Sequence, residues 1–192
     1  MHPPGRAKVD AVRVLIAAIA CWGVGCAGAS SNAPTTDFQP TDVSLFDNAV
    51  DLVEAPVIVE GQWSGAFERR VGRADLIAVV QVDSLSSDLV KRRSAYRLTV
   101  IVRDRLKGSS STELVLRVRD DEAGYPSVRV NEDRLLHHPF VAFIKWEADT
   151  GSSELIAHWH LSPDSDAVRD KIEFFLRQPV RDTHTEVEVV EP

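Results

Sequence analysis

Residues 96–103 read Tyr-Arg-Leu-Thr-Val-Ile-Val-Arg, and residues 113–119 read Glu-Leu-Val-Leu-Arg-Val-Arg. In both stretches apolar residues recur at every second position, the period at which successive side chains of a strand leave opposite faces. The connection between them contains Leu106-Lys107-Gly108 followed by three serines, which favours a turn. We therefore predict an antiparallel hairpin with one buried face.

Further strands are predicted on both sides of this hairpin. Residues 75–82 and residues 140–146 are nearly continuous apolar runs of strand length, as expected for central strands. In residues 155–161 apolar side chains alternate again, which places Trp159 and Leu161 on one face. Short strands are also predicted at 57–59 and 128–130. The polar and charged residues 84–94 predict a loop.

Two helices are predicted, one before and one after these strands. Trp63, Phe67 and Val71 recur four residues apart, which predicts a short helix over residues 63–73. A second helix begins near Pro163, followed by acidic residues, and ends before Pro179. The fold class we predict is mainly β (α+β): a small antiparallel OB-like β-barrel or curved sheet with a short N-terminal helix and a C-terminal helix.

The N-terminal residues follow the order of a secretory signal. Three cationic residues, Arg6, Lys8 and Arg13, precede the uncharged segment 14–25, and small residues lead into Cys26. A helix that spans a bilayer needs roughly 20 apolar residues, so this segment is short for a membrane span. We therefore predict an exported protein.

The residues before Cys26 resemble the lipobox of bacterial lipoproteins, although Gly23 stands where a leucine is usual in that family. The resemblance implies that Cys26 becomes the first mature residue and carries the lipid, with Cys21 as a second candidate. Ala27 follows the cysteine, which by resemblance to enterobacterial sorting implies the outer membrane of a Gram-negative envelope. Two alternatives stay open: an ordinary signal cleaved elsewhere, and an anchor that remains attached.

The composition predicts four segments along the chain. They are a lipoprotein signal peptide at 1–25, a flexible tether rich in Ala, Ser, Thr and Pro at 26–45, a single β-rich globular domain at 46–178, and an acidic tail at 179–192. Within the tail, residues 185–189 read Thr-Glu-Val-Glu-Val and either fray or add an edge strand.

Charge and cysteine content exclude some classes of function. The precursor has a formal net charge of −7, and removal of its signal, which carries a net +2, takes the mature chain to −9. Nucleic-acid binding requires Lys and Arg to neutralise phosphates, so we predict no nucleic-acid partner. Cys21 and Cys26 are the only cysteines, so a mature chain acylated at Cys26 can form no disulfide.

Residues 74–82, 96–100 and 105–108 together resemble the opening of netrin-type and tissue-inhibitor-of-metalloproteinase-like OB barrels. Residues 140–146 match the later core strand of that family. The resemblance implies a five-stranded barrel with a C-terminal helix and a protein-binding role. In the inhibitors a free N-terminal cysteine chelates the protease zinc. Because Cys26 is predicted to be acylated here, protease inhibition is not carried over.

His158 and His160 are the sharpest local candidates for chemistry. Two residues apart on a strand, they leave the same face, which is opposite to the face of Trp159. Two imidazoles and a third ligand could hold zinc or copper. The alternative is a polar outer face of the sheet on which histidines are simply tolerated.

The charged excursion over residues 120–138 is the predicted partner-binding region. Its candidate residues are Asp120, Asp121, Tyr125 and Arg129, because excursions on a rigid barrel commonly carry binding residues. No nucleophile elbow, phosphate-binding glycine loop or His-Glu-x-x-His motif occurs in the sequence. We predict a non-enzymatic, membrane-tethered interaction module without a cofactor, whose partner is an envelope protein or polymer. The alternatives are a metal-dependent envelope protein that uses His158 and His160, and a structural accessory lipoprotein.

Overall fold

The structure is a computed structural model that describes residues 36–52, 65–90, 93–149, 151 and 154–178. The elements in chain order are η1 (Pro40–Ser44), β1 (Ala49–Val50), α1 (Gly65–Arg73), β2 (Leu76–Val90), β3 (Arg93–Lys107), β4 (Glu113–Arg119), α2 (Tyr125–Arg129), α3 (Glu132–Leu135), β5 (Pro139–Ala148), β6 (Leu155–Pro163) and α4 (Asp166–Arg177). Cys26, the predicted strand at 57–59 and the tail at 179–192 lie outside the described residues. None of the helices in the described ranges combines the length and apolar character needed to span a bilayer.

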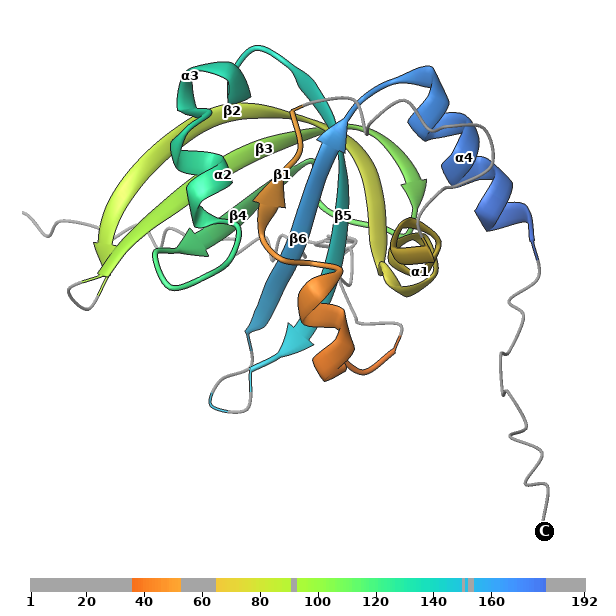
Figure 1. The fold of residues 1–192 in the computed structure, drawn as a ribbon, viewed down its shortest axis with the longest axis horizontal. Coiled ribbons are helices and arrows are strands. Elements are labelled where there is room, and N and C mark those ends of the chain that lie inside the picture. The colour runs from red at the N-terminus through yellow and green to blue at the C-terminus, as the bar shows by residue number, and fades with distance from the viewer. Residues whose placement is uncertain (1–35, 53–64, 91–92, 150, 152–153, 179–192) are drawn as a thin grey trace, which may run out of the picture.

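The six strands form one curled sheet, a half-barrel, with the order β1-β6-β5-β2-β3-β4 (Figure 1). Neighbouring strands are antiparallel except for the short pair of β1 and β6, which is parallel. Three register shifts interrupt the pairing of β2 with β3. Such bulges increase the local twist and bend the strand, which helps the sheet to curl. The predicted mainly β, OB-like curved sheet with a short N-terminal helix and a C-terminal helix is therefore confirmed.

The longest pair of strands runs through the segment 84–94, which we predicted to be a loop. β2 continues to Val90 and β3 begins at Arg93, so this prediction was wrong. The cause is cross-strand pairing, which satisfies the backbone of residues whose polar side chains face solvent. Leu85 also pairs with Leu98 and packs against the apolar core, which holds the extension in register.

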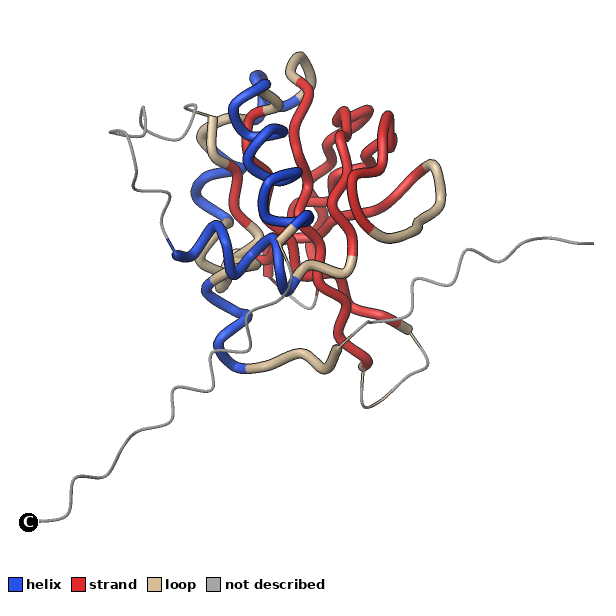
Figure 2. Tube along the Cα trace, turned by 90° about the vertical axis from the view of Figure 1, so that its right-hand side faces the viewer, coloured by secondary structure: helices blue, strands red, loops and turns tan. Residues whose placement is uncertain are grey.

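Apolar side chains form two cores, one on each face of the curled sheet. The inner core includes Leu98, Val100, Leu116, Phe140, Trp146 and Trp159, and the outer core includes Phe46, Phe67, Val71, Val141, Phe143 and Ile172. The faces predicted from the alternation in β3, β4 and β6 are those that the inner core buries. Helices α1 and α4 cover the outer core. Figure 2 shows the helices gathered on one side of the molecule, while strands form the other side.

The excursion between β4 and β5 folds into α2 and α3, which close the inner side of the half-barrel. Val128 and Leu135 are fully buried in the inner core. The short strand predicted at 128–130 was therefore wrong, because Pro126 occupies a first-turn position that suits a helix. A Cβ atom on Gly124 would lie 2.0 Å from the Asn48 carbonyl oxygen, so glycine lets the start of α2 pack beside β1.

The folded domain begins before residue 46, inside the segment predicted to be a tether. Asp42 of η1 is buried, and both of its carboxylate oxygens accept hydrogen bonds from Arg73 of α1, at 2.9 and 2.6 Å. Leu45 is buried in the outer core. The described part of the predicted tether thus belongs to the domain, because hydrogen bonds from Arg73 and Lys145 and the burial of Leu45 outweigh a composition typical of linkers.

Candidate functional site

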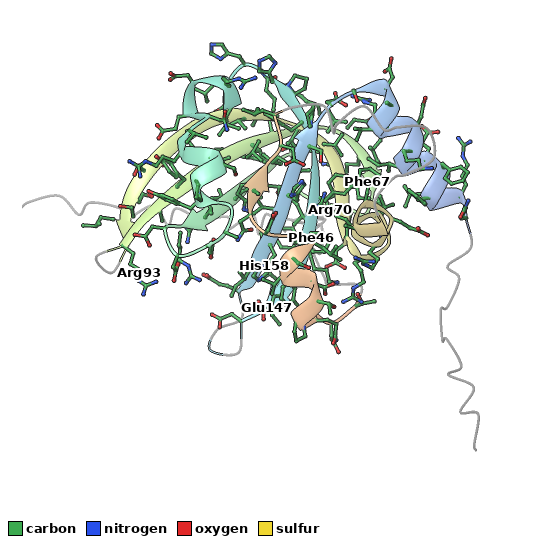
Figure 3. All side chains as sticks on the ribbon, viewed as in Figure 1. Phe46, Phe67, Arg70, Arg93, Glu147 and His158 are labelled. Carbon is green, nitrogen blue, oxygen red and sulfur yellow. The ribbon has the colours of Figure 1, made fainter. Side chains whose placement is uncertain are left out.

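The two histidines predicted as metal ligands leave the outer face of β6, opposite to Trp159 in the inner core. The Nε2 atom of His158 lies 2.7 Å from Oε2 of Glu147, and Figure 3 shows the two residues side by side. The ring of His158 also stacks on Phe38, with 4.3 Å between ring centroids. His160 is buried and contacts a different set of groups. Each imidazole therefore has its own partners.

His160 lies between two carboxylates on the segment around β1. Its Nδ1 atom is 2.9 Å from Oδ1 of Asp47, and its Nε2 atom is 3.0 Å from Oδ2 of Asp51. Only the protonated ring can donate from both nitrogens. Burial lowers the pKa of His160, and Arg70 opposes the charge, but the hydrogen bonds to the two carboxylates outweigh both, so the pKa of His160 lies above its ordinary value. The hydrogen bond from His160 in turn holds the pKa of Asp51 below its ordinary value.

The raised pKa of His160 makes stability depend on pH in a defined direction. We expect the free-energy difference of unfolding between the wild type and His160→Gln to be complete below about pH 6.5, the ordinary histidine value. It should shrink as the pH rises through the folded-state pKa of His160, because the neutral ring can no longer donate to both Asp47 and Asp51. Urea unfolding at a series of pH values from 5.5 to 9 measures it. The matched control is His138→Gln, an exposed position, and a difference that grows above pH 7 would contradict the expectation.

The described residues do not converge into a metal-binding group. Within the described ranges, no set of three or more His, Cys, Asp and Glu side chains is placed to hold a metal ion. A metal at His160 would have to displace Asp47 or Asp51 from a ring nitrogen. Zinc or copper binding by His158 and His160 therefore stays a prediction that metal titration would test.

The four predicted partner-binding residues have different surroundings. Asp120 pairs with the backbone of Ser94, and Asp121 forms an ion pair with Arg93 at the tip of the hairpin. Tyr125 is half-buried, with its ring 5.1 Å from that of Tyr96. Arg129 is exposed on α2. Three of the four candidates thus make contacts that hold the excursion against the sheet.

A different surface remains open where the curled sheet nearly closes, between β4 and β6. In an antiparallel ladder, every second residue turns both its N–H and its C=O toward the same neighbouring strand. The Asp120 N–H, just past the end of β4, donates to the Ser94 carbonyl of β3. The even-numbered residues of β4 therefore direct their N–H and C=O groups toward β3. The N–H and C=O groups of Val115 and Arg117 therefore point to the free edge of β4.

The facing edge of β6 is also open along its first half. The Asn48 N–H donates to the Trp159 carbonyl at 2.7 Å, so odd-numbered residues of β6 direct their amide groups away from β5. β1 covers this edge only at residues 160 and 161. The amide groups of Leu155 and Ala157 therefore face the free edge, and within the described ranges they have no hydrogen-bond partner.

A small cavity lies between these two edges, and we call the whole feature the β4–β6 seam. The cavity has a volume of about 270 Å³. Its lining residues are Val115, Arg117, Trp146, Asp149, Glu154, Leu155, Ile156 and Ala157. At one end, the indole N–H of Trp159 donates to the Arg117 carbonyl at 3.0 Å and holds the two strands together. The seam thus combines backbone groups that have no partner within the described ranges with a mixed lining, in which Trp146 and Leu155 lie near the charged residues Arg117, Asp149 and Glu154.

Two arginines stand side by side on the outer face next to the seam. Arg97 of β3 lies directly opposite Arg117 of β4, and Ser86 of β2 lies opposite Arg97. Both arginines are exposed, and within the described part of the chain neither forms an ion pair or hydrogen bond through its side chain. Like charges in directly opposite positions are unfavourable. A carboxylate beside Arg117 would relieve this repulsion.

Sequence reasoning did not single out this seam. Arg97 and Arg117 were recognised only as polar positions of two alternating strands, and residues 155–161 only as a strand with one apolar face. The available signal was that both predicted neighbouring strands carry arginines on the same outward face. The distance between β4 and β6 depends on how far the sheet curls, which no local pattern reports.

Comparison with protein-family models, curated proteins and solved structures finds no match to this chain. The resemblances to the lipobox and to netrin-type OB barrels therefore stay predictions. The geometry of the β4–β6 seam provides the structural basis for a functional proposal.

Proposed function

We propose that this protein is a lipid-anchored protein of a bacterial envelope whose domain binds an extended peptide segment along the β4–β6 seam. The observation that carries the proposal is a pair of facing strand edges whose amide groups largely have no partner within the described residues: Val115 and the Arg117 N–H on one side, and Leu155 and Ala157 on the other. An extended peptide added to a free edge gains main-chain hydrogen bonds, and pockets for alternate side chains give selectivity. The proposed role is binding and not catalysis.

The strand edges that border the seam cavity favour a peptide over a small molecule. The cavity measures about 270 Å³, at the lower end of the roughly 300–1,000 Å³ of small-molecule sites, and its two long sides are strand edges that an extended backbone can pair with. Apolar side chains of a bound strand would contact Trp146 and Leu155, while its backbone would pair with the edges. Main-chain hydrogen bonds would thus supply most of the affinity, and contacts of a few side chains would supply the selectivity.

The lipid anchor would support binding through local concentration. A lipid on Cys26 would confine the domain to the membrane surface, where a partner at the same membrane meets it at an effective concentration far above that in solution. The acidic chain would gain little attraction from an anionic leaflet, so the acyl chains and not charge would hold it there.

A proline at position 115 tests the seam directly. Val115→Pro removes an N–H that points to the free edge and leaves the β3–β4 ladder intact, and proline is tolerated at such edge positions. Peptides selected from a random display library against the chain should bind this variant about tenfold or more weakly, because a peptide carbonyl loses its donor. Binding is measured by fluorescence anisotropy.

Val115→Thr is the matched control, because threonine keeps both the N–H and the branched side chain. It should bind the selected peptides as the wild type does. Urea unfolding of both variants shows whether the fold is kept. A library that yields no peptide sensitive to Val115→Pro in a folded variant would rule the seam out as the binding surface.

A further inference from the structure

The acidic tail contains a segment whose sequence pattern suits the seam. Residues 185–189 read Thr-Glu-Val-Glu-Val, with a glutamate at every second position between apolar or small residues. This is the pattern of a strand with one apolar and one acidic face. The segment lies outside the described residues, and the described domain holds an open place for such a strand.

We propose that residues 185–189 of one copy of the chain occupy the β4–β6 seam of a second copy. The inference rests on the proposed function, since it uses the same seam and names its partner as another molecule of this protein. The segment would add a strand at the free edges of β4 and β6, and would extend the half-barrel toward closure.

The two faces of the segment match the two sides of the seam. Inner-core residues such as Leu116 belong to one face of β4, and Arg117 belongs to the other. A strand placed between β4 and β6 would therefore direct Val187 and Val189 toward Trp146, on the inner side of the seam. Glu186 and Glu188 would then leave the outer face.

Charge favours acidic side chains at one end of the seam. The exposed pair of Arg97 and Arg117 has no carboxylate partner within the described ranges. A glutamate beside Arg117 would offset the repulsion between the two guanidinium groups. Asp149 and Glu154 line the opposite end of the cavity and would repel a glutamate there. The carboxylates of a bound strand should therefore lie beside Arg117 and away from Asp149 and Glu154.

The position of α4 favours a second copy as the source of the segment. Figure 1 shows the C-terminal end of α4 well away from the lower end of β6, where the seam opens. A segment that leaves α4 must cross the width of its own domain to reach its own seam. A neighbouring copy has no such restriction, and anchoring at one membrane raises its local concentration. Two copies that exchange segments would form a closed dimer.

The test compares the full chain carrying Cys26→Ser with the same chain ending at Gln178, which keeps every described element. Sedimentation velocity over a range of concentrations should show a dimer for the full chain and a monomer for the shorter one. A labelled synthetic peptide of residues 179–192 should bind the shorter chain saturably, and a peptide of the same composition in scrambled order should not.

Charge reversal separates recognition from a folding defect. Arg117→Glu in the shorter chain should weaken binding of the 179–192 peptide about tenfold or more. A peptide with both Glu186→Lys and Glu188→Lys should bind the Arg117→Glu variant more tightly than the natural peptide does. Recovery of this kind requires that the segment lies beside Arg117, whereas a damaged fold would bind neither peptide.

The outcomes distinguish this inference from the proposed function. A full chain that stays monomeric, or a 179–192 peptide that does not bind, overturns the inference. A peptide that binds while the full chain stays monomeric places the segment in its own seam and overturns the second copy as its source. If library peptides depend on Val115 but the tail does not bind, the proposed function stands and this inference alone fails.

Discussion

Replacing Asp75 with alanine is expected to destabilise the fold by about 3–5 kcal/mol, because it leaves a buried ammonium group without its counter-ion. The Nζ atom of Lys145 lies 2.9 and 3.0 Å from the two carboxylate oxygens of Asp75, and the two side chains are 0% and 2% exposed. The same carboxylate accepts a hydrogen bond from the Trp146 N–H at 2.9 Å. Domains of this kind have roughly 5–15 kcal/mol of total stability, so much of it would be lost.

Urea unfolding monitored by tryptophan fluorescence would measure the effect. The matched control is Glu173→Ala, which breaks the exposed pair with Arg177 and should change the unfolding midpoint little. The double variant Asp75→Leu with Lys145→Met should recover part of the loss, since it removes both charges together. An Asp75→Ala midpoint equal to that of the wild type would show that the pair does not support the fold.

Replacing Cys26 with serine is expected to move the protein from the membrane fraction to the soluble fraction almost completely. Each buried methylene of an acyl chain contributes about 0.8 kcal/mol to membrane binding, and serine cannot take the place of the thiol as the attachment atom. Ultracentrifugation of lysed cells followed by immunoblotting measures the distribution between the two fractions.

Cys21→Ser is the control for this second experiment. It should leave the protein in the membrane fraction if Cys26 carries the lipid, and it should release the protein if Cys21 does. A Cys26→Ser protein that stays in the membrane fraction after washing with high salt would show that another segment anchors the chain. This experiment tests only which residue anchors the protein, and it does not test peptide binding at the β4–β6 seam.

Much of the fold could be predicted because strand alternation is a local property. The pattern in residues 96–103 and 113–119 was enough to state which side chains face the core, and the inner core buries Leu98, Val100 and Leu116 as predicted. The C-terminal helix was predicted to begin near Pro163, whereas it begins at Asp166, where the Ser165 side chain accepts a hydrogen bond from the Val168 N–H and Pro163 still belongs to β6. In these places local sequence and tertiary packing favour the same structure.

The incorrect predictions arose where packing outweighed local composition. Residues 84–94 are polar, yet most of them extend the long hairpin because the partner strand satisfies their backbone. Residues 128–130 are apolar at alternate positions, yet Val128 belongs to a helix because it fills the open side of the half-barrel. The composition of a segment indicates whether its side chains favour solvent. It does not indicate which partner strand or core the rest of the chain places beside that segment.

The mainly β fold class and the buried faces of β3, β4 and β6 followed from the amino-acid sequence alone, because both depend on the spacing of apolar residues along the chain. Only the tertiary structure decided which groups meet. Asp47 and Asp51 reach His160 across 113 and 109 residues, and the edges of β4 and β6 come together at a seam beside Arg117. These contacts depend on how far the sheet curls, which is set by bulges and by the packing of two cores. The placement of His160 between two carboxylates and the β4–β6 seam could for this reason be found only in the folded chain.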